Sequence, residues 1–457
     1  MEVFAVIVSL LLLIFLAYRG FSVILVAPIC ALLAVALSGN ATLLGTYTEI
    51  FMRGLGNFII KYFPIFLLGA IFGKVMDHSG AARSIAHWIV GKLGSGQAIL
   101  AIVLSCAILT YGGVSIFIVA FGVFPMAKEL FKAAEIPKRL IPGSIGLGSF
   151  TFSMTALPGT IQIHNVIPMP YFRTDAFAAP IFGLVASGLI FGLGLVYLQF
   201  RAGKARSMKE GYGFDEVLEE VNKEGQPPIA LAFMPVLLLI VGNFVFSNVW
   251  IPTWNVDYLQ SATFGHTDLD NVRGIWGIIL AMSLAIGFSL LAFRKSMGEP
   301  KSTINEGISG TMLPLFNTAS EVGYGSTIAT LTGFELIKNF VLGLFSENPL
   351  LSLAVAVNML AGITGSASGG LAIALETLGA EFYELALVKD IDPELMHRIA
   401  TMASSGLDSL PHNGAVITLL MICGLTHRQS YKEIGVTTLL IPLSIMFAMV
   451  LAVSAFY

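Results

Sequence analysis

The chain has 457 residues, of which 56% are hydrophobic and only 12% are charged, and its formal net charge is -3. Soluble domains carry about 25% charged residues, so this composition excludes an ordinary soluble protein. It predicts an all-α polytopic membrane protein of the cell inner (plasma) membrane. The slight negative charge also excludes the global basic surface that nucleic-acid binding needs.

Apolar stretches of spanning length follow one another along the chain. A helix that crosses a bilayer needs about 20 mostly apolar residues. The first stretch has neither a basic leader nor a small-residue cleavage pattern, so we interpret it as a span and not as a signal peptide. The predicted spans are 3–18, 22–39, 58–76, 139–168, 176–199, 228–247, 273–293, 308–330, 399–425 and 434–456.

The charges of the connecting loops predict the orientation. Basic residues gather directly after 176–199, before 139 and after 293. Cytoplasmic loops carry such an excess of Lys and Arg. The loop 248–272 holds Asp residues but no Lys or Arg, so we expect it outside. Both chain termini then lie outside, and 201–227 is a charged cytoplasmic linker.

Matching features in the two parts of the chain predict an internal repeat. Pro158 follows Gly80, and Pro411 follows Gly333, by 78 residues in both cases (158 − 80 and 411 − 333). Each part is expected to hold five spans, an odd number, together with a short amphipathic segment, a glycine-tipped hairpin and a helix broken at Leu-Pro. The second copy is therefore inverted, a pattern found in secondary transporters; chance similarity of glycine-rich helices is the alternative. The predicted domains are 1–200, the first inverted repeat; 201–227, the linker; and 228–457, the second inverted repeat.

Two glycine-rich turns are predicted to be the tips of re-entrant hairpins. Residues 97–110 and 114–127 are each too short to cross a bilayer. The charged segments on both sides of them belong on the same face of the membrane, so the chain enters and returns. The tips are 110–115 in the first half and 365–370 in the second. Bare backbone at that depth is tolerated only where it is buried or lines a wet cavity.

The two tips and the two Pro-broken helices are expected to meet near the midplane of the membrane. A helix break exposes N–H groups and a partial positive charge, which suit a carboxylate. Polar side chains are costly inside apolar spans, so their density at both breaks favours a binding function. The alternative is that some hydroxyls only satisfy carbonyls freed beside the prolines. The candidate substrate-binding residues are Tyr111, Gly112, Gly113, Ser115, Thr155, Gly159, Thr160, His164, Asn165, Ser366, Ser368, Gly369, Ser405, Ser409, His412 and Asn413.

Two carboxylates and one histidine are candidates for ion coupling. Asp408 lies four residues before His412, and Glu321 lies in the middle of 308–330. A carboxylate at membrane depth can carry a proton or hold a cation, and a histidine titrates near neutral pH. The alternatives are a structural Asp–His pair and a structural hydrogen bond of Glu321. We expect proton coupling, with Na⁺ as the other possible cation.

At these motifs the sequence resembles the gluconate permease family, within the wider ion transporter superfamily, over nearly the whole chain. The resemblance is carried by Leu68–Lys74 with Ser79–Ala81, by the glycine tips, and by the broken segments Thr155–Gly159 and Asp408–Gly414. It implies proton-coupled import of gluconate or related hydroxy acids by a homodimer in which a transport unit moves against a scaffold. The broken segments differ from those of the gluconate carriers, and the chain is more similar to members labelled as 3-hydroxybutyrate permeases.

The expected function is secondary active import of a small organic carboxylate resembling 3-hydroxybutyrate, with gluconate or another sugar acid as the alternative substrate. An anion channel is the alternative class, but a channel needs a polar stripe or charged rings along several helices. An enzyme is not expected, because no HExxH, GxSxG or P-loop motif is present. Cys30, Cys106 and Cys423 fit neither a zinc site nor a disulfide framework, so no metal or cofactor is expected.

Overall fold

The computed structural model describes residues 2–19, 21–39, 42–213, 226–344, 348–364, 366–411 and 413–456. Within these ranges every regular element is a helix, which confirms the predicted all-α class. Gly365, His412 and residues 214–225 of the predicted linker lie outside the described residues.

Most predicted spans appear as apolar helices. In the described chain, five helices are long and apolar enough to cross a membrane. These are Leu43–His78, Pro180–Ser207, Ile229–Thr253, Leu269–Ala292 and His427–Ser454. The other predicted spans are shorter, interrupted or more polar. The bounds of the apolar helices are α1 (Glu2–Tyr18), α2 (Val23–Leu37), α11 (Pro180–Ser207), α12 (Ile229–Val245), α13 (Leu269–Ala292) and α21 (Ile441–Ser454). The rod that ends with α21 begins with the polar helix α20 (His427–Ile434).

Two of the helices begin well before their predicted spans. The predicted span 58–76 is part of a continuous 36-residue rod that ends with α4 (Met52–His78). The predicted span 308–330 is the C-terminal part of α14 (Pro300–Ala329). Hydropathy alone truncates such helices, because their first turns are polar; in the first rod, Arg53 pairs with Glu49 at 2.9 Å.

Each half contains a helical hairpin preceded by a further helix. α5 (Ala81–Leu93) bends by 99° into the segment that forms α6 (Ala98–Tyr111), and α7 (Ile116–Ala133) packs back on α6. Gly94 makes the corner at a φ of 66°, which only glycine adopts without strain. The second half repeats this order with α15 (Thr332–Leu344), α16 (Pro349–Thr364) and α17 (Ala367–Val388).

The tip of the second hairpin is shorter than predicted. α17 begins at Ala367, so Gly369 and Gly370 lie in its first turn and not in the loop. Ser366 caps this turn by accepting a hydrogen bond from the Gly369 N–H at 3.1 Å. A capped first turn favours helix where the glycines alone predicted a turn.

Both predicted broken helices are interrupted around their Leu-Pro motifs. α8 (Ile141–Ser149) is followed by turns up to α9 (Ile163–Val166) and α10 (Met169–Phe172). In the second half, α18 (Pro393–Ala403) and α19 (Gly414–Cys423) are separated by a stretch with one short turn, η8 (Leu407–Ser409). We call 150–162 the first break and 404–413 the second break.

The first break starts early because hydroxyl groups compete for the carbonyls of α8. Thr151 donates to the Leu147 carbonyl at 2.7 Å, and Ser153 donates to the Gly148 carbonyl at 2.5 Å. Such local bonds offer the backbone an alternative to the helical ladder. Pro158 therefore lies inside a stretch that has already left the helix.

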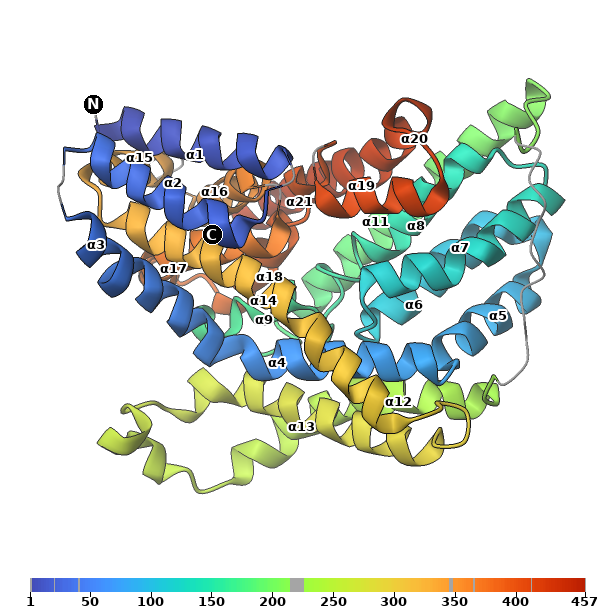
Figure 1. Ribbon diagram of the computed structural model, residues 1–457, viewed down its shortest axis with the longest axis horizontal. Coiled ribbons are helices and arrows are strands. Elements are labelled where there is room, and N and C mark those ends of the chain that lie inside the picture. Colours follow the sequence, from blue (N-terminus) through green and yellow to red (C-terminus); the bar gives the residue numbers. More distant parts are fainter. Residues whose placement is uncertain are drawn as a thin grey trace.

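The helices form two groups, which Figure 1 shows around the crossing of α4 and α14. The central frame consists of α4 and α14, the pair α1 and α2 packed on α14, and the pair α12 and α13 packed on α4. The hairpin unit consists of the two hairpins, the two breaks and the helices α8–α11 and α18–α21. The unit packs directly on the frame where α17 contacts α14, and the contacts of α5 with α12 and of α15 with α1 also join the two groups.

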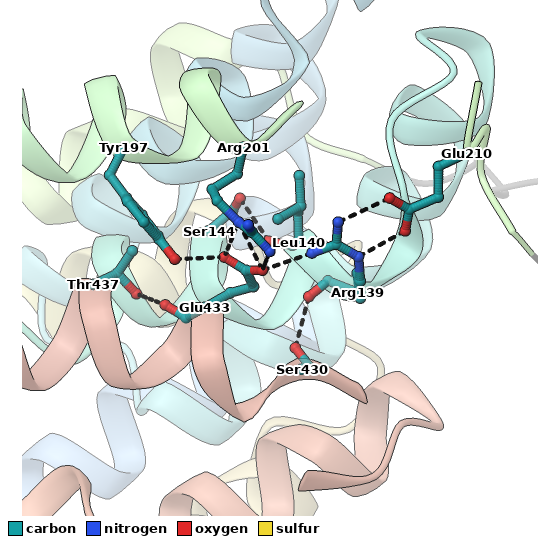
Figure 2. Close-up of polar contacts among 9 residues, drawn as sticks. All are labelled: Arg139, Leu140, Ser144, Tyr197, Arg201, Glu210, Ser430, Glu433 and Thr437. Atoms are coloured by element: carbon teal, nitrogen blue, oxygen red, sulfur yellow. Dashed lines mark hydrogen bonds and ion pairs between the residues drawn. The ribbon is translucent and has the colours of Figure 1, made fainter. Parts of the chain in front are cut away.

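An ion network joins distant parts of the hairpin unit (Figure 2). The buried Glu433 of α20 accepts hydrogen bonds from Arg139 and Arg201, each at 2.6 Å, and from the Tyr197 hydroxyl at 2.8 Å. Arg139 lies directly before α8, whereas Arg201 and Tyr197 lie on α11. Arg139 also bonds to Glu210 at 2.7 Å, and this hydrogen bond lowers the pKa of Glu210. One buried carboxylate thereby fixes α8, α11 and α20 relative to one another.

Candidate functional site

The tip of the first hairpin is bonded to the first break. The Tyr111 hydroxyl donates to the Pro158 carbonyl at 2.7 Å. The Gln162 amide nitrogen Nε2 donates to the Thr110 carbonyl, also at 2.7 Å. The Thr110 carbonyl also accepts from the Gly113 N–H at 2.9 Å, so the Gln162 bond adds a contact from the break to the end of α6.

Glycines allow this close approach. Gly113 has a φ of 84°, and a Cβ there would collide with the side chain of Ile161 in the first break. Gly159 has a φ of 85°, and its Cβ would lie 2.8 Å from the Tyr111 hydroxyl. Both positions therefore need glycine for their backbone angle and for space.

The first tip also faces the central frame. Gly112 ends α6 against Val236 of α12, where a Cβ would lie 3.0 Å from the valine methyls. Ser115 begins α7 beside Gly73 of α4, with 3.7 Å between the Ser115 nitrogen and a Cβ at position 73. The tip thus lies between its own break and the frame.

The two breaks touch each other. The hydroxyls of Thr155 and Ser405 lie 3.3 Å apart and form a hydrogen bond in which each can donate. Both side chains are buried. The second break also packs on α16, where Gly362 leaves room for Leu407. Residues 250 apart in sequence are therefore neighbours, as expected if both breaks line one site.

Asn165 is the centre of a buried hydrogen-bond network behind the first break. Its Nδ2 donates to the carbonyls of Thr160 and Ala176 at 2.8 and 2.9 Å. Its Oδ1 accepts from Arg398 at 2.8 Å and lies 3.1 Å from His397 Nε2. In this conformation both the nitrogen and the oxygen of the Asn165 amide are hydrogen-bonded to other protein groups.

The tip of the second hairpin faces α14. The Ser366 hydroxyl lies 3.4 Å from the Glu321 carboxylate, and the hydroxyls of Thr318 and Ser368 also lie 3.4 Å apart. Glu321 is 3% exposed. Any Cβ at Gly369 would collide with the Glu321 carboxylate. This glycine therefore makes room for the acidic group at the start of α17.

The second break holds the other acidic candidate. The Ser409 hydroxyl donates to Asp408 Oδ1 at 3.3 Å. Asn413 caps α19 by accepting hydrogen bonds from two backbone N–H groups at 2.7 and 3.1 Å. His412, which the sequence pairs with Asp408, lies outside the described residues.

Several buried polar atoms around these elements have no hydrogen-bond partner within the described part of the chain. They are Thr110 Oγ1, His164 Nδ1, Asn317 Oδ1 and Ser320 Oγ. Thr110 borders the first tip, His164 follows the first break, and the other two flank Glu321. Unpaired buried polar atoms are rare, so each of these calls for a ligand or water as its partner. Thr110, Asn317 and Ser320 were not among the sequence candidates.

The chain matches a known transporter over its full length. It is 46% identical over 473 aligned positions to the Uncharacterized transporter YxjC of Bacillus subtilis (strain 168), which covers 100% of this chain and 99% of that protein. The chain belongs to this family of membrane transporters. The transporter matches no family model.

More distant similarities agree with this family. Over 241 residues the transporter is 24% identical to the High-affinity gluconate transporter of Escherichia coli (strain K12), covering 51% of this chain and 52% of that protein. Its fold is similar to the crystal structure of the YdaH transporter of Alcanivorax borkumensis, with a TM-score of 0.53, 14% identity and coverage of 91% and 89%. At that identity the similarity shows the fold alone. Together with the apolar helices, these findings identify a multi-pass membrane protein.

Two buried residues of α18, His397 and Arg398, were not among the sequence candidates. The predicted span began at 399, which left both in a loop. Asp392-Pro393 is the sequence signal that predicts an earlier helix start, because an N-cap residue followed by proline marks the beginning of a helix. The Asp392 carboxylate does accept from the Glu394 N–H at 2.9 Å, so α18 starts early and contains both residues.

Gly113→Val is expected to lower uptake by about tenfold or more, because valine is strained at a positive φ and its side chain would displace Ile161. Uptake per folded protein, measured in proteoliposomes, checks this. Gly122→Val is the matched control, since nothing lies within 4 Å of a Cβ at Gly122 of the same hairpin. Uptake like wild type in the Gly113 variant would mean that the tip is not near the substrate.

Proposed function

We propose that the protein is a secondary active transporter that imports a small organic carboxylate, 3-hydroxybutyrate or a related hydroxy acid, together with a proton. The observation that carries this proposal is the hydrogen bond between Thr155 and Ser405, which joins two helix breaks in a chain of a transporter family. Paired breaks offer N–H groups and hydroxyls to an anion away from bulk water.

The packing of the helices supports two inverted repeats, 1–200 and 228–457. The pair α1 and α2 in the first half has its counterpart in α12 and α13. α2 packs on α14, and α13 packs on α4; α15 packs on α1, and α5 packs on α12; α6 packs on α8, and α16 packs on α18. A swap of the two halves reproduces each of these contacts. Such exchange symmetry is typical of transporters that work by alternating access about a central site.

The lengths of the hairpin helices support a re-entrant arrangement. α6 has 14 residues and α16 has 16. At 1.5 Å per residue they are shorter than a hydrocarbon core of about 30 Å. Tips that stop inside the bilayer would meet the two breaks, and the linker 201–227 would lie in the cytoplasm. Movement of the hairpin unit against the central frame, within a homodimer, would expose the site to alternate sides.

The unpaired polar atoms support a ligand site at the tips and breaks. Thr110, His164 and Asn317 each have a buried atom that lacks a partner in the described chain. The substrate carboxylate would bind between them and the candidate residues of the two breaks, with the apolar side chain of Ile161 beside its carbon chain. A short hydroxy acid suits such a site better than a fully hydroxylated one.

Glu321 and Asp408 are the proposed coupling residues. Each accepts a hydrogen bond from a neighbouring serine, and neither forms an ion pair within the described residues. A charge is costly to bury at membrane depth, and a proton removes it. His412 would take part if it lies against Asp408. A bound Na⁺ in place of the proton is the alternative.

Uptake into proteoliposomes tests the function. Labelled 3-hydroxybutyrate and gluconate are supplied under an inward proton gradient, an inward sodium gradient, or none. Saturable uptake of 3-hydroxybutyrate that needs the proton gradient and shows counterflow supports the proposal. Preference for gluconate, which the relative's name suggests, would change the substrate. Flux without counterflow would instead indicate a channel.

Asp408→Asn is expected to abolish gradient-driven accumulation and to leave counterflow largely intact, because an amide cannot exchange a proton but keeps similar size and hydrogen bonds. Both activities are measured in the same proteoliposomes, with Asp390→Asn on the exposed loop before α18 as the control. Equal loss of both activities would remove Asp408 as the coupling residue.

A further inference from the structure

Arg398 is the largest fully buried side chain in the described chain, and all its donors are used. Its Nε and Nη2 donate to the Ala178 carbonyl at 3.1 and 2.8 Å, and Nη2 also donates to the Ala176 carbonyl at 3.1 Å. Its Nη1 donates to the Thr155 carbonyl at 3.1 Å and to Asn165 Oδ1 at 2.8 Å. A guanidinium has five N–H bonds, and these contacts account for them.

The backbone carbonyls that accept from Arg398 lie in segments outside the helices, where no helical N–H group pairs with them. Thr155 lies in the first break, and Ala176 and Ala178 lie between α10 and α11. A buried carbonyl without a hydrogen bond destabilises the fold. The Ala176 carbonyl also accepts from the Gly159 N–H at 2.7 Å and from Asn165. One side chain from the second half therefore bonds to two unwound segments of the first half and orients them relative to each other.

His397 reinforces the same contact. Both hydrogens of Asn165 Nδ2 go to carbonyls, so Asn165 Oδ1 is an acceptor. His397 Nε2 must then carry the hydrogen that it donates to this oxygen at 3.1 Å. Its Nδ1 is left to accept from the Thr174 hydroxyl at 2.5 Å. These bonds are mutually consistent, so His397 carries its hydrogen on Nε2 and the Asn165 amide oxygen faces Arg398 and His397.

The bonding of Arg398 is to dipoles and not to a carboxylate. Asp175 and Glu394 are near enough to act on it electrostatically. Asp175 accepts from the Phe177 N–H at 2.7 Å, and Glu394 accepts from the Ala179 N–H at 2.8 Å. The planar guanidinium of Arg398 therefore donates in several fixed directions to backbone carbonyls, which the ammonium group of a lysine cannot reproduce.

We infer that Arg398 is a positioning residue that holds the first break against the second, so that the two breaks behave as one rigid body. The inference goes beyond the proposed function, and it rests on that function only for its uptake readout. It follows that the Thr155–Ser405 contact persists during transport, and that access changes by movement of the whole hairpin unit.

Hydrogen–deuterium exchange of the full-length protein in mild detergent tests the inference without a substrate. In Arg398→Lys, amide exchange in 150–162 and 173–179 is expected to rise about tenfold, because an ammonium cannot span all these acceptors. Exchange in α12 and α13 is expected to stay unchanged. Arg173→Lys, an exposed change in the same region, is the control and should resemble wild type. Arg398→Met is expected to show a larger effect than Arg398→Lys.

The uptake readout separates positioning from a general structural role. For labelled 3-hydroxybutyrate or gluconate, whichever the wild type carries, Arg398→Lys is expected to raise KM about tenfold and to change the maximal rate per folded protein much less. Unchanged exchange in both segments, or a uniform rise over the whole chain, would overturn the inference. Loss of folded protein in both variants would also overturn it, since Arg398 would then be a requirement of the entire fold. If the wild type carries neither acid, the proposed function fails while the exchange experiment still decides the inference.

Discussion

Gly370→Ala is expected to prevent the second hairpin from closing and to remove most folded protein. A Cβ at this position would collide with the backbone nitrogen and Cα of Ala361, and would lie 2.6 Å from the carbonyl carbon of Leu360. Backbone atoms cannot rotate away as a side chain can, so α16 and α17 would have to separate along their contact. We expect a loss of more than about 3 kcal/mol, at the upper end for overpacking.

The yield and the melting temperature of purified protein in mild detergent measure this effect. Gly188→Ala on α11 is the matched control, because nothing lies within 4 Å of a Cβ there. Alanine is also the better helix former by about 1 kcal/mol, so this control should be as stable as wild type or slightly more stable. A Gly370 variant that melts like the control would show that the two hairpin helices are not packed as described.

Glu433→Ala is expected to lower the stability by about 3 kcal/mol, because it leaves Arg139 and Arg201 without the carboxylate that both of them share (Figure 2). The Glu433 side chain is 1% exposed and those of the two arginines are 23% and 16% exposed, so solvent replaces the lost bonds only in part. The unfolding midpoint in a detergent titration is the measurement.

Glu210→Gln provides the comparison for Glu433→Ala. Glu210 bonds to the same Arg139, but its side chain is 34% exposed. Arg139 lowers the pKa of Glu210, so this pair is ionised at neutral pH and is lost only when the pH falls through that lowered pKa. An exposed pair contributes about 1 kcal/mol or less. Equal effects of the two variants at neutral pH would mean that burial does not distinguish Glu433.

The sequence predicts the main elements well where glycine and proline interrupt apolar runs. The first tip, the amphipathic segments and both breaks follow from such residues, because backbone angles and missing N–H groups act locally. The extent of the first break does not follow, since it depends on whether Thr151 and Ser153 bond to α8 or to water. At the second tip the glycines predicted a turn, but they lie in the first turn of a helix, because Ser366 caps that helix.

The candidate site could be predicted only in part. That Thr155 and Ser405 are neighbours rests on tertiary packing across 250 residues, which no local pattern encodes. Arg398 was not predicted, because the apolar span begins at 399, just after it. Asp392-Pro393 nevertheless marks a helix start upstream of Arg398. Asn165 was expected to bind substrate, and its amide is engaged by protein groups in this conformation, so its role in binding stays a prediction.

The two hairpins meet the central frame through different chemistry. Around the first tip, the described contacts with α4 and α12 are between apolar atoms and backbone, at Gly73 and Val236. At the second tip, Glu321 and Thr318 of α14 face serine hydroxyls. Apolar surfaces can shift against each other without loss of hydrogen bonds. Hydroxyl and carboxylate groups must replace their mutual hydrogen bonds with water or a proton before they separate. If the unit moves against the frame as proposed, the polar contacts at the second tip must be exchanged, whereas the apolar contacts at the first tip need not be.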